Sequence, residues 1–168
     1  MELHTVSLAK HHIRKDFDCG QEVLDEYLKK QANQDIRKRI AMCFIISDEP
    51  KDNRVKGYYT LSNTSIPREL IPNDLQKRFP YAYKSIPATL LGRLARDRNF
   101  TKQGIGEKLL IDALYRSYLA SREIGSFAVV VEPINEFAEQ FYSSYGFTKL
   151  PDSGKMILAM KTIEQLFE

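Results

Sequence analysis

Apolar and polar positions along the chain follow two different periods, and each period predicts one kind of element. Apolar runs of strand length predict strands at residues 3–8, 41–46, 55–66, 89–94 and 127–131, and a last hairpin from 147–150 and 156–161. Apolar residues at helical spacing predict helices over residues 23–36, 105–114 and 136–144. The elements form one continuous series without an internal repeat or a low-complexity tract.

The first predicted helix has a buried stripe and a basic end. We expect its N-terminal cap near Asp18 or Cys19. The expected buried stripe consists of Val23, Leu24, Tyr27, Leu28, Gln31, Ala32 and Ile36. The helix ends in Arg37, Lys38 and Arg39, and the simplest interpretation of these cations is that they complement the negative pole of the helix dipole.

The long second strand of the first hairpin contains two adjacent tyrosines, Tyr58 and Tyr59. Because successive side chains of a strand point to opposite faces, we expect one to face a cleft and the other to pack in the core. The connection that follows, from Pro67 to Lys84, is long for a compact domain, which favours a functional loop. It includes a predicted short helix at 73–78 and brings Lys77 and Arg78 toward the central strand.

The most informative stretch joins the central strand to the next helix. Gln103, Gly104, Ile105 and Gly106 stand where that helix begins, at its unpaired N–H groups and the positive end of its dipole. Such a place binds anions, phosphate above all, and glycine lets the backbone approach a ligand closely. The Walker pattern and the dinucleotide fingerprint both fail, the second because Leu109 stands where a third glycine is needed. On the glycines alone, a tight strand-to-helix turn is an equally good interpretation.

Length and composition set the class of protein. At 168 residues the chain can build one sizeable core and shows no linker, so we expect a single domain over residues 1–168. No apolar run approaches membrane-spanning length, and the N-terminus lacks the pattern of a secretory signal. We therefore expect a cytoplasmic protein. The net charge of +3 does not by itself indicate a nucleic-acid-binding protein.

Neither cysteines nor histidines follow a metal-binding pattern. Cys19 and Cys43 are far apart in sequence, and we expect both to be free, buried thiols. His4, His11 and His12 lie near the N-terminus without a partner at metal-ligand spacing, so we expect no metal site.

Four motifs carry a resemblance to a known family: Phe17-Asp-Cys-Gly20, Gly57-Tyr-Tyr-Thr-Leu-Ser62, Leu91-Gly-Arg-Leu-Ala95 and Phe141-Tyr-x-x-Tyr-Gly-Phe147. Together they resemble the GNAT acyltransferases, and most closely the GNAT toxins of type II toxin–antitoxin pairs. The resemblance runs over most of the chain. It implies the GNAT acyltransferase fold, an α/β (α+β) architecture with a central mixed, mostly antiparallel sheet flanked by helices.

The resemblance also implies that the protein uses acetyl-coenzyme A. The pyrophosphate would bind the amides at the helix start, and the pantetheine arm would pair with the central strand. The residues expected to bind it are Leu94, Ala95, Arg96, Thr101, Lys102, Gln103, Gly104, Ile105, Gly106 and Asn135. Thr101 replaces the Gln or Arg that is common in the family, and Arg96 replaces an apolar residue.

Tyr142, within the last motif, is the expected general acid. A phenol with a pKa of about 10 is protonated at neutral pH and can give its proton to a thiolate whose conjugate acid has a pKa of about 8.5. On the helix pattern alone, a tyrosine packed beside Phe141 and Tyr145 would be the better interpretation, and the position in the motif reverses it. No general base is evident, which favours an α-amine as substrate. The pKa of an α-amine is about 8, so part of it is already neutral without a base.

In the toxins that the chain resembles, the corresponding basic helix lies where RNA binds. The resemblance therefore implies that the protein acetylates the α-amine of aminoacyl-tRNA and so blocks translation. The residues expected to contact RNA are Arg37, Lys38, Arg39, Lys77, Arg78 and Arg93. The resemblance also implies a ribbon-helix-helix antitoxin as partner and a homodimer.

Two other functions fit the same residues. One is a GNAT enzyme that acetylates a protein N-terminus, a lysine or a small amine, for which substrate binding would depend only weakly on salt. The other is a catalytically silent binding module that holds RNA or a protein. The presence of Tyr142 and of both loop glycines argues against the silent module.

Overall fold

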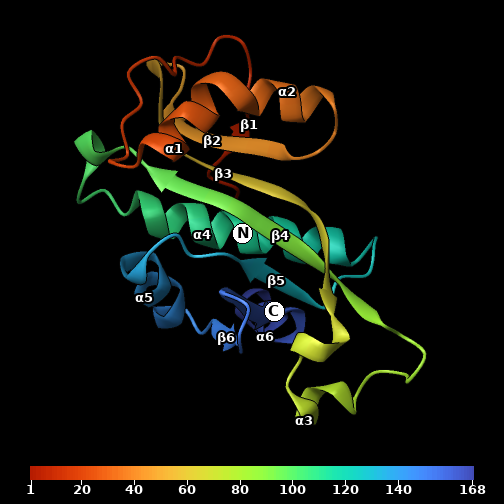
Figure 1. The fold of residues 1–168 in the computed structure, drawn as a ribbon. Helices are drawn as coiled ribbons and strands as arrows, with labels where there is room; N and C mark the ends of the chain where they lie inside the picture. The colour runs from red at the N-terminus through yellow and green to blue at the C-terminus, as the bar shows by residue number, and fades with distance from the viewer. The chain divides into compact units, whose positions relative to one another are not determined.

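The computed structural model describes all 168 residues, and Figure 1 shows its helices and strands. The strands are β1 (Val6–Ser7), β2 (Met42–Asp48), β3 (Asp52–Pro67), β4 (Ser85–Arg96), β5 (Ala128–Val131), β6 (Thr148–Leu150) and β7 (Lys155–Ala159). The helical elements are α1 (Glu22–Glu26), η1 (Tyr27–Gln31), α2 (Ala32–Arg37), η2 (Arg68–Leu70), α3 (Asn73–Gln76), η3 (Arg98–Phe100), α4 (Ile105–Ser121), α5 (Glu136–Ser144) and α6 (Met160–Phe167). No helix has both the length and the apolar character needed to span a membrane.

The strands form one sheet in the order β1-β2-β3-β4-β5-β7-β6. The pairs β1–β2, β2–β3, β5–β7 and β6–β7 are antiparallel, whereas β4 and β5 are parallel, with Thr89 opposite Val129 and Leu90 opposite Val130. The predicted α+β architecture with a mixed, mostly antiparallel sheet is therefore confirmed.

The contacts within the chain divide it into two compact units, residues 1–62 with 91–115 and residues 63–90 with 116–168. The first unit contains β1, β2, the first part of β3, the last part of β4, the helices α1, η1 and α2, and the first part of α4. Its core packs these helices against the sheet through Phe17, Tyr27, Leu28, Ala32, Cys43, Ile45, Val55, Tyr58 and Ala95.

Tyr58 and Tyr59 point to opposite faces of β3, as predicted, but neither faces a cleft. Both side chains are fully buried. The Tyr58 hydroxyl donates to the Leu24 carbonyl at 2.7 Å, on the face covered by α1 and η1. The Tyr59 hydroxyl donates to Asp112 Oδ2 of α4 at 2.5 Å, on the other face. The expectation of a cleft was wrong because a helix covers each face of the strand.

The second unit has its own apolar cluster, formed by Ile66, Ile71, Ile86, Ala88, Ala128, Val130, Leu150 and Ile157. The long connection after β3 belongs to this unit and is folded around Arg68. The Arg68 guanidinium donates to four backbone carbonyls, those of Gln76, Phe79, Pro80 and Tyr83, at 2.8–3.2 Å. This connection is therefore an ordered loop whose backbone acceptors are satisfied by one side chain.

Three local predictions are wrong. The helix cap is Gln21, not Asp18 or Cys19, and helix α1 begins at Glu22. Val23, expected in the buried stripe, is 81% exposed. The last strand ends at Ala159, and Met160–Phe167 form helix α6, which was not predicted.

Candidate functional site

The end of β4 is fixed by a network around one buried carboxylate. Asp97, which follows β4 directly, accepts from the backbone N–H of Asn99 at 2.8 Å and of Asp18 at 3.1 Å. Its own N–H donates to the Lys56 carbonyl of β3. These bonds turn the chain out of the strand into η3 and then into the glycine loop, so the loop starts from a fixed point.

The Phe17-to-Gly20 motif has a structural role at the same place. The Asp18 carboxylate accepts from the Gly20 N–H at 3.0 Å and from Arg98 Nε at 3.0 Å. The Gly20 N–H, followed by the nearby Arg98 charge, lowers the pKa of Asp18. Gly20 has a φ of +90°, which side chains with a Cβ rarely adopt. The motif thus ties the segment before α1 to the residues after β4.

The glycine loop leads into α4 as predicted. Gly104 has a φ of +67°, Lys102 has a φ of +60°, and α4 begins at Ile105. Residues 101–104 are exposed. The amides of the first helical turn have no acceptor within the helix, so the loop presents N–H donors and the positive end of a 17-residue helix to solvent.

Lys56 lies beneath this loop and was not singled out by the sequence. Its Nζ donates to Gln103 Oε1 at 3.3 Å and forms an ion pair with Asp48 at 2.6 Å. The same Nζ lies over the Phe100 ring, 4.9 Å from the ring centre. It is 8% exposed, which is unusual for lysine. The loop therefore rests on a nearly buried ammonium group.

Arg93 stacks on Tyr27, which is hydrogen-bonded within a group of three residues that the sequence did not single out as functional. Its guanidinium carbon lies 3.6 Å from the centre of the Tyr27 ring. The Tyr27 hydroxyl donates to Asp35 at 2.8 Å, and Gln31 donates to the other oxygen of Asp35 at 2.9 Å. Burial opposes ionisation of Asp35, but these two hydrogen bonds and the charge of Arg93 outweigh it and lower the pKa.

The remaining basic residues divide between the two units. Arg37, Lys38 and Arg39 are exposed at the end of α2, in the first unit. Lys77 and Arg78 are exposed directly after α3, in the second unit. All five are therefore free of burial and open to an anionic partner.

Tyr142 lies in the second unit, on the last turn of α5. Its ring packs against Phe141 and Phe147, with centroids 5.4 Å and 5.3 Å away. Its side chain is buried, and burial raises its pKa. Its hydroxyl makes no hydrogen bond to any of the 168 residues. The structure thus gives Tyr142 a packed ring and a protonated hydroxyl that is free to donate.

Asn135 has a defined structural task in the same unit. It is the N-terminal cap of α5, and its side-chain oxygen accepts from the Ala138 N–H at 2.8 Å. The side chain is exposed, and the amide NH₂ group remains available to a ligand.

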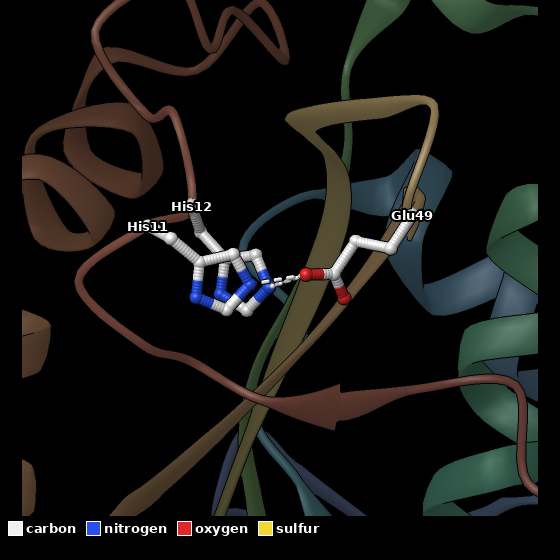
Figure 2. A group of neighbouring side chains, drawn as sticks. All are labelled: His11, His12 and Glu49. Atoms are coloured by element: carbon white, nitrogen blue, oxygen red, sulfur yellow. Dashed lines mark hydrogen bonds and ion pairs between the residues drawn. The ribbon is translucent and has the colours of Figure 1, made fainter.

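A cluster of potential metal ligands joins two histidines that the sequence left without a partner. Figure 2 shows the rings of His11 and His12 meeting the carboxylate of Glu49, which lies on the turn after β2. Their ligand atoms lie within 4.8 Å of one another. His12 is buried, and its Nε2 stands 3.2 Å from Glu49 Oε1.

The protonation of His12 argues against a metal at this cluster. The Ala9 N–H donates to His12 Nδ1 at 2.9 Å, which makes Nδ1 an acceptor. The proton of the neutral ring therefore sits on Nε2, which is 3.2 Å from Glu49 Oε1 but has no acceptor in hydrogen-bond geometry. The hydrogen bond from His11 and then the nearby His12 ring lower the pKa of Glu49. His11 is hydrogen-bonded to the Glu49 carboxylate, and a metal at His12 Nε2 would have to displace that proton.

The two cysteines are free, as predicted, but only Cys43 is buried. Burial raises the pKa of each thiol to about 12, so neither is a thiolate at neutral pH. They take no part in the chemistry considered below.

Comparison with known proteins places the chain in a family. No family model matches the sequence. A curated protein described as a tRNA-acetylating toxin, from Mycobacterium tuberculosis, is 32% identical over 151 residues, which cover 89% of this chain and 87% of that protein. The chain belongs to the family of tRNA-acetylating GNAT toxins. A probable toxin TacT from Sinorhizobium fredii is 29% identical over 163 residues, covering 92% of this chain and 89% of that one.

Solved structures of GNAT toxins share the fold over nearly the whole chain. A tyrosine-to-phenylalanine mutant of KacT matches with a TM-score of 0.91 and 32% identity, covering 99% of this chain and 100% of that one. AtaT complexed with acetyl-methionyl-tRNAfMet matches with a TM-score of 0.89 and 33% identity over 99% and 100%. An AtaT tyrosine-to-phenylalanine mutant bound to the C-terminus of the antitoxin AtaR and acetyl-CoA matches with a TM-score of 0.80 and 31% identity over 97% and 96%.

Proposed function

We propose that this GNAT toxin transfers the acetyl group of acetyl-coenzyme A to the α-amine of aminoacyl-tRNA and thereby blocks translation. The observation that carries this proposal is the similarity, over nearly the full length, to a tRNA-acetylating toxin and to AtaT complexed with an acetylated aminoacyl-tRNA. The AtaT structure with acetyl-CoA supports the choice of cosubstrate. The exposed amides before α4 supply the chemistry for binding its phosphates.

The cofactor would be held mostly by backbone groups. We assign the pyrophosphate to the loop of Thr101, Lys102, Gln103, Gly104, Ile105 and Gly106, and the pantetheine arm to the backbone of Leu94, Ala95 and Arg96. Backbone donors do not depend on the side chain at residue 101, so the unusual Thr101 is compatible with this site. Asn135 would contribute its free amide NH₂ group in addition to capping α5.

In the reaction, the neutral α-amine attacks the thioester carbonyl, and a tetrahedral oxyanion forms. As the intermediate collapses, the carbon–sulfur bond breaks and the coenzyme A sulfur takes a proton, while the amine loses one to water. We assign the proton donor to Tyr142, whose phenolate then regains a proton from water. Burial raises its pKa, so the phenol stays protonated at neutral pH and its unpaired hydroxyl can bond the sulfur as negative charge develops there. Tyrosine-to-phenylalanine mutants of both KacT and AtaT have been solved.

The RNA would be bound through its phosphates by exposed cations. We assign this role to Arg37, Lys38, Arg39, Lys77, Arg78 and Arg93. Contacts of this kind supply affinity without base specificity and weaken as salt rises. An amine substrate without phosphates would lack that dependence.

The partners are proposed on the same ground. AtaT is bound to the antitoxin AtaR, and KacTA is solved in a complex with DNA. We propose that this protein is likewise held by an antitoxin, of ribbon-helix-helix type, that it forms a homodimer, that it works in the cytoplasm, and that residues 1–168 act as one GNAT domain.

The test is transfer of labelled acetyl from acetyl-coenzyme A. The purified protein is incubated with total charged tRNA, with the same tRNA after deacylation, and with a mixture of peptides. The proposal predicts label on charged tRNA alone. Label on peptides or small amines, with none on charged tRNA, would keep the acetyltransferase and overturn its substrate. No turnover with any acceptor would favour a silent binding module.

A further inference from the structure

Arg93 is a half-buried arginine that stacks on an aromatic ring and forms no salt bridge, although its charge helps to lower the pKa of Asp35. Its guanidinium lies flat on Tyr27, with 3.6 Å between Cζ and the ring centre. It makes no hydrogen bond or ion pair with any of the 168 residues. Stacking on an aromatic ring leaves the N–H groups at the edge of the guanidinium unused, and these form a fork that matches phosphate. The arginine is thus held in place while its N–H groups remain available to a ligand.

The Tyr27 ring is held in place by its own hydrogen bond to Asp35. Tyr27 opens a single π-helical turn, η1, that separates α1 from α2. The Tyr27 hydroxyl and the Gln31 amide, about two turns and one turn before Asp35, both donate to its carboxylate. Asp35 is nearly buried. Since π-helical turns often occur at functional sites and a buried carboxylate is costly unless bonded, this support indicates more than packing.

The position of Arg93 on β4 separates it from the cofactor loop. Arg93 and Ala95 lie on the face of the sheet that is covered by α1 and η1, where Tyr27 and Tyr58 pack. Helix α4, whose first turn follows the glycine loop, packs on the other face, against Gly57 and Tyr59. Arg93 therefore reaches a ligand from the side opposite the helix that would hold the coenzyme A phosphates. An acceptor substrate that meets Arg93 would approach from that side.

We propose that Arg93 binds the phosphodiester that joins the last two nucleotides of the acceptor strand, and that Tyr27, Gln31 and Asp35 are positioning residues for it. The inference rests on the proposed function and narrows the substrate to an amine attached to a phosphodiester-linked nucleotide end. The phosphodiester nearest the aminoacyl ester is the one a side chain at residue 93 would meet, because Leu94 to Arg96 are the proposed site of the pantetheine arm, which carries the thioester at its end. A bidentate guanidinium contact would then fix how far the amine reaches toward the thioester.

The experiment compares two acceptors that carry the same amine. One is charged tRNA and the other is the matching aminoacyl-adenosine, which has no phosphate. Arg93→Met should raise the KM for charged tRNA roughly tenfold to a hundredfold, the loss expected for one charged hydrogen-bonded contact. The kcat/KM for aminoacyl-adenosine and the KM for acetyl-coenzyme A should stay unchanged. The slope of log KM against log salt for charged tRNA should fall by about 0.7, the value of one phosphate contact to a single strand.

Tyr27 variants separate stacking from folding. Tyr27→Phe keeps the ring under Arg93 and should keep a KM for charged tRNA close to that of the wild type. Tyr27→Leu removes the ring and should raise this KM without changing kcat/KM for aminoacyl-adenosine. Arg122→Met is the control, because Arg122 lies 6.0 Å from the ring of the buried Tyr118 and this arginine–tyrosine pair has no proposed ligand. It should change neither KM nor the salt slope.

The outcomes are distinguishable. A wild-type protein that does not acetylate charged tRNA overturns the proposed function itself. A wild-type protein that does, with an Arg93→Met variant of unchanged salt slope, overturns only the role of Arg93. An equal loss on charged tRNA and aminoacyl-adenosine would place Arg93 at the amine, and a raised KM for acetyl-coenzyme A would place it at the cofactor. Either result contradicts the proposal. Arg93→Lys, which keeps the charge but not the fork, should recover part of the salt slope.

Discussion

Gly57 of β3 lies against Leu109 of α4 so closely that a methyl group at residue 57 would stand 2.8 Å from Leu109 Cδ1. The same methyl group would stand 2.9 Å from Ile105 Cγ2 and 3.1 Å from the Ala95 carbonyl. The glycine of the Gly57-to-Ser62 motif is therefore a packing requirement of the first turn of α4. Because that turn follows the glycine loop, the contact also sets where the loop amides lie.

Gly57→Ala should destabilise the protein and weaken cofactor binding together. Overpacking of this kind costs about 1 to 3 kcal/mol of unfolding free energy, and displacement of Ile105 should raise the KM for acetyl-coenzyme A. Urea unfolding and steady-state kinetics check both. Gly125→Ala is the control, since no atom lies within 4 Å of a methyl group there. A Gly57→Ala protein of wild-type stability would show that α4 can shift freely.

Gly104→Ala should affect cofactor binding through backbone conformation alone. Gly104 has a φ of +67° and nothing within 4 Å of an added methyl group, so the cost is the strain of a left-handed residue, about 1–2 kcal/mol. Gly154 of the β6–β7 turn has a φ of +68° and is equally open. Both alanine variants should lose similar stability, but only Gly104→Ala should raise the KM for acetyl-coenzyme A. Equal KM values for the two variants would remove the loop from the cofactor site.

Tyr142→Phe should lower kcat without unfolding the protein. The phenylalanine keeps the packing against Phe141 and Phe147, and the lost hydroxyl has no hydrogen-bond partner in the structure. Loss of a general acid reduces kcat roughly a hundredfold to ten-thousandfold. The measurement is kcat together with the thermal midpoint of unfolding. An unchanged kcat at unchanged stability would transfer the acid role to another group.

Asp35→Asn should make the free energy of unfolding depend less on pH in acid. The pKa of Asp35 is lowered in the folded protein from its usual 3.8, so its contribution is fully present above 3.8 and is lost as the pH falls through 3.8 toward the folded pKa. Wild type should be the more stable protein near neutral pH, and the difference should close below pH 3.8. Urea unfolding of both proteins over that range tests this, and a difference that widens in acid would reverse the sign of the pKa shift.

Zn²⁺ should leave the stability unchanged. Because Nδ1 of His12 accepts from Ala9, its Nε2 carries the proton and has no lone pair for a metal. The thermal midpoint should be the same with and without added Zn²⁺, in the wild type and in His12→Gln. A rise in the wild type that His12→Gln abolishes would establish a metal site at this cluster.

Sequence patterns predicted the elements whose signals are local. Helix α5 spans Glu136–Ser144, as predicted, and the glycine loop precedes α4 as expected. Helix α6 was not predicted because Met160 continues the apolar run of β7. The predicted strand was therefore extended past Ala159, where the helix begins. The π-helical turn has no sequence signal of its own, since its apolar spacing is that of a helix.

Contacts between distant residues were beyond the sequence. Arg93 was singled out for its charge, but nothing in the linear pattern pairs it with Tyr27 or pairs Asp35 with the Tyr27 hydroxyl. His12 and Glu49 likewise meet only because the chain before Phe17 packs against the turn after β2. The positions of the candidate functional residues along the chain could thus be predicted. The residues that hold each of these side chains in place could be identified only from the folded structure.

The central claim is acetylation of the α-amine of aminoacyl-tRNA, and the most direct test is the mass of the 3′-terminal nucleoside. Charged tRNA is incubated with the protein and acetyl-coenzyme A and digested, and the released aminoacyl-adenosine is analysed by mass spectrometry. The proposal predicts a mass increase of one acetyl group located on the amino acid, absent with Tyr142→Phe over the same time. An unmodified aminoacyl-adenosine, or an acetyl group located on a nucleobase, would contradict it.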